Sequence, residues 1–318
     1  MKITPILATL IASVTAVDRI TFDSNGTQIV VYHWQLSCNA ASSRWGRFDR
    51  GRPATKAPVI VMGHGFAALQ TSKLQPYAER FAAAGYHATT FDYRHWGQSD
   101  GVPRNIVDIS LQQADFMAAV AAAKKLQGVD ASRIVIWGSS LSGGTVLSLG
   151  PAFYNDTSSG VVGVISQVPH TNGLATAALT PQQTIPDLVK LSLADMERAK
   201  TDHPHICAYE GYLSIQPNPP GPEYSNFSAR FIVQLPSFSP DVTAAQSHLP
   251  TYLGIGSADN VVSAPAAAKL AARMPNATTY EYEGVGHFDV YPGALAYMEN
   301  LENQVAFLHK FVPLHKSF

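Results

Sequence analysis

The chain has 318 residues, of which 46% are hydrophobic and 14% charged, and its 22 Lys plus Arg against 23 Asp plus Glu leave a net charge of −1. This length allows two domains or one large domain with an insertion, and the composition excludes a disordered, collagen-like or coiled-coil protein. A neutral chain without a Lys/Arg-rich run lacks the basic surface that grips phosphate backbones, so no nucleic-acid partner is expected.

The first sixteen residues have the composition of a secretory signal peptide. Lys2 supplies a positive charge, an apolar stretch follows, and small residues stand at 14–16. We therefore predict that Met1–Ala16 is a signal peptide and that the protein is secreted; the alternative is the N-terminal tail of a cytoplasmic protein. No later stretch of eighteen apolar residues exists, so no transmembrane anchor is expected. Sequons favour a secreted glycoprotein, and they lie at Asn25, Asn155, Asn226 and Asn276.

Short apolar runs bounded by turn residues alternate with amphipathic stretches along the chain. The runs predict strands at Arg19–Phe22, Ile29–Trp34, Val59–Met62, Ala88–Phe91, Arg133–Trp137, Gly163–Gln167, Thr251–Ile255 and Thr278–Glu283. Apolar residues at three- and four-residue spacing predict helices at Lys73–Ala84, Ile109–Leu126, Ala264–Met274 and Met298–Phe311. This alternation predicts an α/β fold with a mostly parallel central sheet flanked by helices.

Two segments interrupt the alternation. Residues 38–57 show no regular spacing of apolar side chains, which predicts an exposed loop. Residues 170–248 contain one helix-like piece, Ile185–Lys200, and we interpret them as a cap inserted between core parts at 17–169 and 249–318. The cap sequence is rich in rings that suit an apolar substrate: Tyr209, Tyr212, Tyr224, Phe227, Phe231 and Phe238.

The sequence Gly138-Ser139-Ser140-Leu141-Ser142 joins a predicted buried strand to a helix. A nucleophile on such a sharp turn needs small residues two positions away on each side, and Ser140 has Gly138 and Ser142 there. Ser139 and Ser142 themselves lack a glycine two positions upstream. We therefore predict that Ser140 is a catalytic nucleophile.

A serine hydroxyl needs a histidine to accept its proton and a carboxylate to orient that histidine. His287 lies in Gly286-His287-Phe288, directly after the last predicted strand. Asp259 follows the strand Thr251–Ile255, and we predict that it is the acid; Asp289, in the histidine's own loop, is the alternative.

Acyl transfer also needs hydrogen-bond donors for the oxyanion. Gly63-His64-Gly65-Phe66 follows the predicted strand Val59–Met62, and its glycines let the backbone approach a substrate. We predict that the backbone amides of Phe66 and Leu141 form the oxyanion hole.

These motifs, in this order, resemble those of the α/β-hydrolase superfamily, from about residue 18 to residue 313. Asp92 with Gly97-Gln98-Ser99-Asp100-Gly101 adds to the likeness. The runs Tyr77–Tyr86, Asp92-Tyr93-Arg94 and Gly286-His287-Phe288-Asp289 are similar to the polyketide transferase and thiohydrolase group of fungal secondary metabolism.

The expected function is that of a serine hydrolase that cleaves a carboxylic ester or thioester of an apolar small molecule through an acyl-enzyme. The alternatives are an acyltransferase or thiohydrolase that releases a polyketide, and a non-catalytic ligand-binding protein of the same fold. No cofactor and no metal are expected, since His203-Pro204-His205 has no third ligand nearby in the sequence. Cys38 and Cys207 allow at most one disulfide bridge.

Overall fold

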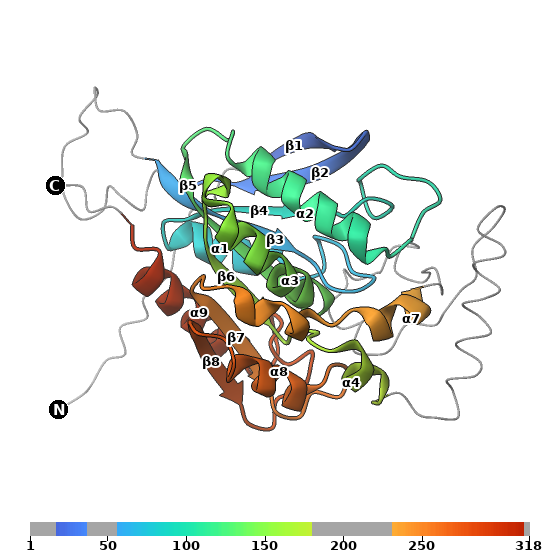
Figure 1. Ribbon diagram of the computed structural model, residues 1–318. Helices are drawn as coiled ribbons and strands as arrows, with labels where there is room; N and C mark the ends of the chain where they lie inside the picture. The colour runs from blue at the N-terminus through green and yellow to red at the C-terminus, as the bar shows by residue number, and fades with distance from the viewer. Residues whose placement is uncertain (1–16, 37–55, 180–230, 315–318) are drawn as a thin grey trace, which may run out of the picture.

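A computed structural model of the protein describes residues 17–36, 56–179 and 231–314. These residues form one eight-stranded sheet with helices on both faces (Figure 1). The strands are β1 (Val17–Ser24), β2 (Thr27–Trp34), β3 (Ala57–Gly63), β4 (His87–Phe91), β5 (Val129–Ser139), β6 (Val161–Gln167), β7 (Thr251–Gly256) and β8 (Ala277–Tyr282). The α-helices are α1 (Gln75–Ala83), α2 (Ile109–Ala123), α3 (Leu141–Asn155), α4 (Gly173–Ala177), α7 (Phe231–Gln234), α8 (Ala264–Ala271) and α9 (Tyr297–Phe311). Single 3₁₀ turns are η1 (Thr157–Ser159), η4 (Leu235–Ser237), η5 (Pro240–Val242) and η6 (Ala244–Gln246).

The strand order is β1-β2-β4-β3-β5-β6-β7-β8. β1 pairs with β2, and β2 with β4, in the antiparallel sense, whereas every pair from β4 to β8 is parallel. The predicted α/β-hydrolase fold with a mostly parallel sheet is thus confirmed. Because parallel strands all end at one edge, the loops after β3, β5, β7 and β8 lie on the same side of the sheet.

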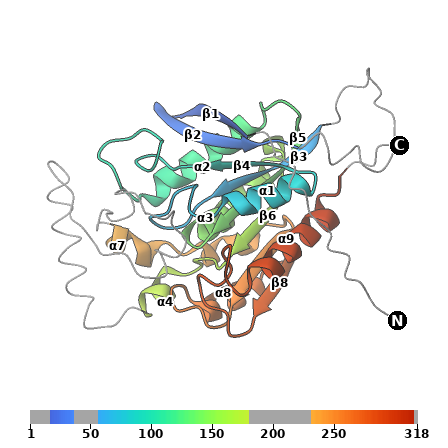
Figure 2. The same ribbon diagram turned by 180° about the vertical axis from the view of Figure 1, so that it is seen from behind.

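Both faces of the central strands are covered, which explains their continuous apolar sequences. In β3, Val59 and Val61 pack in one core cluster with side chains of α2 and α3, while Ile60 and Met62 pack in another with α1 and α9. Figure 2 shows α1 and α9 on the face of the sheet opposite to α2 and α3. α8 joins the α3 face through a smaller cluster.

Each predicted strand exists, and the differences concern where elements begin and end. β3 begins at Ala57, inside the segment predicted as a loop, because the Ala57 amide donates to the Gly128 carbonyl at 2.9 Å and Ala57 pairs with Val129. The prediction of a loop at 38–57 is wrong at this residue. The same pairing extends β5 back to Val129 from the predicted Arg133.

Other predictions lie outside the described residues and stay predictions. They concern residues 180–230 at the centre of the proposed cap, with the helix Ile185–Lys200 and the pair His203 and His205, and also Met1–Ala16, Cys38 and Cys207. Among the described residues, no helix is both long and apolar enough to span a bilayer. In the same part of the chain, no three His, Cys, Asp or Glu side chains come together as a metal site would require.

Two buried histidines pair between β2 and β4. His87 Nε2 donates to the Gly128 carbonyl at 3.1 Å, so its Nδ1 accepts from His33 Nε2 at 3.0 Å. Burial, and then the neighbouring His87, lower the pKa of His33 from 6.5 to about 4, against a smaller opposing effect of Asp18. Burial likewise lowers the pKa of His87. Both imidazoles are therefore neutral in the native state at neutral pH.

This pair predicts a loss of stability in acid. Between pH 6.5 and about 4, His33 is protonated in the unfolded chain but neutral in the native state. The contribution of His33 to the free energy of unfolding is therefore complete above pH 6.5 and falls as the pH drops toward 4. Urea unfolding followed by circular dichroism at pH 7.5, 6.0 and 5.0 measures this slope. His33→Gln, which keeps a donor for His87, should flatten it. An equally steep slope in the variant would contradict the assignment.

Candidate active site

Ser140 lies on the turn between β5 and α3. Its backbone has φ 59° and ψ −120°, a region that costs a non-glycine residue about 1–3 kcal/mol. A Cβ at Gly138 would lie 2.1 Å from the carbonyl oxygen of Ser142, so only glycine fits two positions before Ser140. This turn presents the Ser140 side chain at the N-terminus of α3.

His287 comes from the loop between β8 and α9. Its Nε2 lies 2.9 Å from Ser140 Oγ, although 147 positions separate the two residues in the sequence. Phe288 packs edge-to-face against the imidazole, with ring centroids 5.0 Å apart. His287 is only 2% exposed, so the ring is held on all sides by protein.

Asp259 lies in the loop after β7, and its Oδ2 is 2.7 Å from His287 Nδ1. Its Oδ1 accepts hydrogen bonds from the amides of Val261 and Val262, at 2.8 and 2.9 Å, which fixes the carboxylate. Asp289, the alternative acid, instead accepts from the Gly286 amide at 2.8 Å within its own loop. The structure therefore joins the side chains of 140, 287 and 259 in one hydrogen-bonded series; their catalytic roles stay predictions.

The loop with the predicted oxyanion donor Phe66 packs directly on Ser140. A Cβ at Gly65 would lie 3.0 Å from Ser140 Cβ, so the backbone approaches the serine as closely as a glycine allows. The amide of Leu141, the first residue of α3, has no intrahelical acceptor. Both predicted donors thus lie on segments that border the hydroxyl of Ser140.

Buried His64 stabilises the loop that contains Gly65 and Phe66. Its Nδ1 donates to the Gly65 carbonyl at 3.0 Å, and its Nε2 accepts from the Tyr93 amide at 3.4 Å. Burial lowers the pKa of His64 to about 4, so the ring stays neutral and both bonds persist at neutral pH.

Phe66 also contacts the segment that follows residue 230. Its ring stacks on Phe231 of α7, with centroids 4.6 Å apart and an interplanar angle of 25°. Of the six aromatic residues singled out in the predicted cap, Phe231 and Phe238 are described, and both are buried. The other four lie outside the described residues: Tyr209, Tyr212, Tyr224 and Phe227.

Two buried hydroxyl pairs beside the serine were not predicted from the sequence. Ser142 Oγ lies 2.7 Å from the hydroxyl of Tyr93, and Ser139 Oγ lies 2.6 Å from that of Tyr291. In the first pair, Ser142 satisfies the hydroxyl of a tyrosine that is fully buried. Tyr93 lies in the run Asp92-Tyr93-Arg94, but that run assigns no role to its hydroxyl, and Tyr291 lies in no motif.

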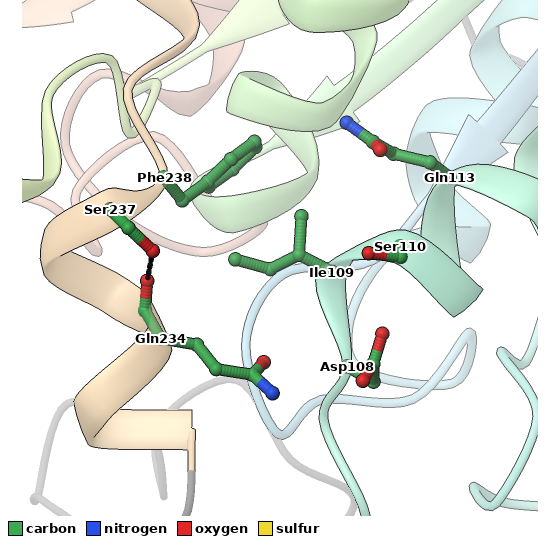
Figure 3. Close-up of a pocket in the computed structure, with 7 residues that line it drawn as sticks. All are labelled: Asp108, Ile109, Ser110, Gln113, Gln234, Ser237 and Phe238. Atoms are coloured by element: carbon green, nitrogen blue, oxygen red, sulfur yellow. Dashed lines mark hydrogen bonds between the residues drawn. The ribbon is translucent and has the colours of Figure 1, made fainter.

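A cavity of about 380 Å³ lies between the start of α2 and the α7–η4 segment (Figure 3). Ile109 and Phe238 contribute its apolar surface. Polar side chains form the rest of the lining: Asp108, Ser110, Gln113, Gln234 and Ser237. The cavity is separate from the hydrogen-bonded series, since neither Ser140 nor His287 lines it.

Comparison with known proteins identifies the family of the chain. The family described as serine aminopeptidase, S33, matches residues 54–288. The quorum-quenching protein AidA of Acinetobacter baumannii is 33% identical over 285 residues, which are 83% of this chain and 90% of that protein. Thiohydrolase aneE of Aspergillus aculeatus is 38% identical over 90 residues, 28% of either chain, which supports the narrower likeness to the fungal group.

Among solved structures, DcsB in complex with its substrate analogue has a TM-score of 0.73 at 17% identity. The alignment covers 93% of this chain and 99% of the DcsB chain, and at this identity it shows the fold alone. The chain therefore belongs to the serine aminopeptidase S33 family of α/β hydrolases and is an enzyme of the hydrolase class.

Proposed function

We propose that the protein is a serine hydrolase that cleaves a carboxylic ester or thioester through an acyl-enzyme intermediate. The observation that carries the proposal is the hydrogen-bonded series Ser140 Oγ–His287 Nε2 at 2.9 Å and His287 Nδ1–Asp259 Oδ2 at 2.7 Å. In this proposal Ser140 is the nucleophile, His287 the general base and acid, and Asp259 the group that orients the imidazole.

The reaction proceeds in two halves. Ser140 Oγ forms a bond to the acyl carbon while its proton moves to His287 Nε2, and the carbonyl oxygen takes the negative charge. That charge lies toward the amides of Phe66 and Leu141, which would donate to it. The intermediate then expels the alcohol or thiol, which takes the proton from His287. A water molecule then attacks the acyl carbon of the acyl-enzyme while His287 Nε2 accepts its proton. This second intermediate breaks its bond to Ser140 Oγ, which takes the proton back from His287, and the carboxylic acid leaves.

The acyl group is expected to be apolar. Phe288 packs against the imidazole of His287, and Phe66, which follows the glycine that approaches Ser140, stacks on Phe231. Aromatic rings favour apolar ligands over charged ones. A thioester substrate is supported by the likeness to a relative named as a thiohydrolase.

A panel of acyl substrates tests the function. The purified protein is assayed with p-nitrophenyl esters, N-acetylcysteamine thioesters and lactones of matched acyl chains, while intact mass spectrometry follows the protein. We expect turnover of at least one class and a transient mass increase equal to the acyl group, mapped to Ser140. A fluorophosphonate probe should label the same residue.

Two results would lead to the other functions. Product formation that depends on an added alcohol, with little hydrolysis, would indicate an acyltransferase. Absence of turnover, of an acyl adduct and of probe labelling, in protein that is folded by circular dichroism, would contradict the proposal and favour a ligand-binding role.

A further inference from the structure

A buried asparagine on α9 lies at the centre of a polar network beneath the candidate site. Asn300 is fully buried, and its Nδ2 donates to the Tyr77 hydroxyl at 2.9 Å and to Gln167 Oε1 at 2.8 Å. Its Oδ1 accepts from the Tyr252 hydroxyl at 2.9 Å and from Gln304 Nε2 at 3.2 Å. Burial of an amide is costly unless its donors and acceptor are used, so these bonds fix the orientation of the side chain.

One branch of the network runs from Asn300 to the loop that carries His287. Tyr77 of α1 accepts from Asn300 and donates its own hydroxyl to the carbonyl of Val290 at 2.5 Å. Tyr77 is fully buried, and burial raises the pKa of its phenol, so it remains a donor at neutral pH. Val290 stands three residues after His287.

The second branch reaches the same loop through the strand of the serine. Asn300 and Gln304 both donate to Gln167 Oε1 at the end of β6. Gln167 Nε2 donates to Ser139 Oγ at 3.1 Å, and Ser139 Oγ lies 2.6 Å from the hydroxyl of Tyr291. Tyr291 stands four residues after His287, and Ser139 directly precedes Ser140.

The two branches therefore end on consecutive residues of one loop. This loop has no regular secondary structure between the end of β8 at Tyr282 and the start of α9 at Tyr297. It must nevertheless hold the imidazole of His287 within hydrogen-bond distance of Ser140, and a displacement of about 1 Å can cost roughly 100-fold in rate.

We propose that Tyr77 and Tyr291 are positioning residues for His287. Tyr291 holds the loop against Ser139, on the strand that carries Ser140, and Tyr77 holds it against α1. Asn300 orients the two hydroxyls, that of Tyr77 directly and that of Tyr291 through the second branch. This role rests on the catalytic function proposed above for Ser140 and His287.

Tyr86, a buried tyrosine outside the network, provides a control. The hydroxyl of Tyr86 donates to the backbone carbonyl of Val312 at 3.0 Å, near the opposite end of α9. Tyr86→Phe therefore removes the same chemical group and a bond donated to a backbone carbonyl, as Tyr77→Phe does, although Tyr77→Phe also removes the bond from Asn300. The Tyr86 hydroxyl makes no bond to the histidine loop.

The test compares Tyr77→Phe, Tyr291→Phe, the double variant and Tyr86→Phe with the unchanged protein. We expect kcat to fall about tenfold or more in each of the first two, with KM changed less than about twofold, because the lost bonds act on the alignment of reacting groups. The double variant should lose less than the product of the two single losses, since both bonds hold one loop. Tyr86→Phe should retain kcat although it, too, loses stability to urea.

A readout independent of turnover separates the two proposals. The proton between His287 Nδ1 and Asp259 should give a downfield proton NMR signal, assigned by its loss in His287→Ala. We expect this signal to broaden in Tyr77→Phe and Tyr291→Phe and to persist in Tyr86→Phe. If the protein turns over esters but the first two variants keep both kcat and the signal, the positioning role is overturned alone. If the unchanged protein neither turns over substrate nor takes up the fluorophosphonate probe, the proposed function fails, and the positioning role fails with it.

Discussion

Replacing Ser140 with alanine should lower kcat for an ester substrate by about 10⁴- to 10⁶-fold while the protein folds normally. The change removes the oxygen that His287 Nε2 contacts at 2.9 Å, so no acyl-enzyme can form. Alanine occupies the same positive-φ backbone at no greater strain than serine, and its smaller side chain fits the turn. Steady-state kinetics and fluorophosphonate labelling measure the loss.

Ser148→Ala is the matched control, because Ser148 lies on the same helix and its hydroxyl donates to the Thr145 carbonyl away from the hydrogen-bonded series. It should keep normal turnover and labelling. His287→Ala should lose nearly as much activity as Ser140→Ala, and the double variant little more, since the residues act as a unit. Persistent activity in Ser140→Ala, with the probe on Ser139 or Ser142, would refute the assignment of the nucleophile.

Asp259→Asn should lower kcat by about 10⁴-fold at nearly unchanged stability. The asparagine amide would present a donor to His287 Nδ1, where a carboxylate now accepts at 2.7 Å, and this favours the wrong tautomer of the imidazole. The remaining amide oxygen can still accept from the amides of Val261 and Val262, so the loop should keep its conformation. Kinetics and thermal unfolding, measured on the same preparation, separate the two effects.

Asp289→Asn provides the comparison. Within the described part of the chain, the Asp289 carboxylate accepts one hydrogen bond, from the backbone amide of Gly286. The side-chain oxygen of an asparagine can accept the same bond. Its loss of activity should therefore be much smaller than that of Asp259→Asn. A greater loss at Asp289, without a loss of stability, would show that the acid has been misassigned.

Much of the fold could be predicted because it depends on local patterns. β3 and β5 contain apolar runs because both faces of the parallel sheet are covered. The residues around Ser140 are small because the turn between β5 and α3 leaves no room for larger side chains. Element ends were predicted less well. β5 begins at Val129 because of its pairing with Ala57, which is a contact between distant segments.

The three residues of the hydrogen-bonded series could also be predicted, since each follows a predicted strand and parallel strands end at one edge. Asp259 was preferred over Asp289 because the loop after the neighbouring strand β7 can reach Nδ1 of His287, the nitrogen that faces away from Ser140. α9 did carry a signal that was overlooked. Asn300 and Gln304 fall on its apolar face, with Leu301 and Val305, and a polar residue in such a position predicts a buried partner.

The sequence by itself determined which segments form strands, where the turn at Ser140 lies and which residues are expected to meet there, because each is encoded in a few adjacent residues or in a periodicity. Only the tertiary structure decided what holds them in place. Tyr77 meets Val290 across 213 positions and Ser139 meets Tyr291 across 152, and the stacking of Phe66 on Phe231 is equally remote in sequence. Such pairs leave no periodic trace, because the partner of a buried polar group or ring is set by how helices and loops dock on the sheet, and that docking is a property of the whole chain.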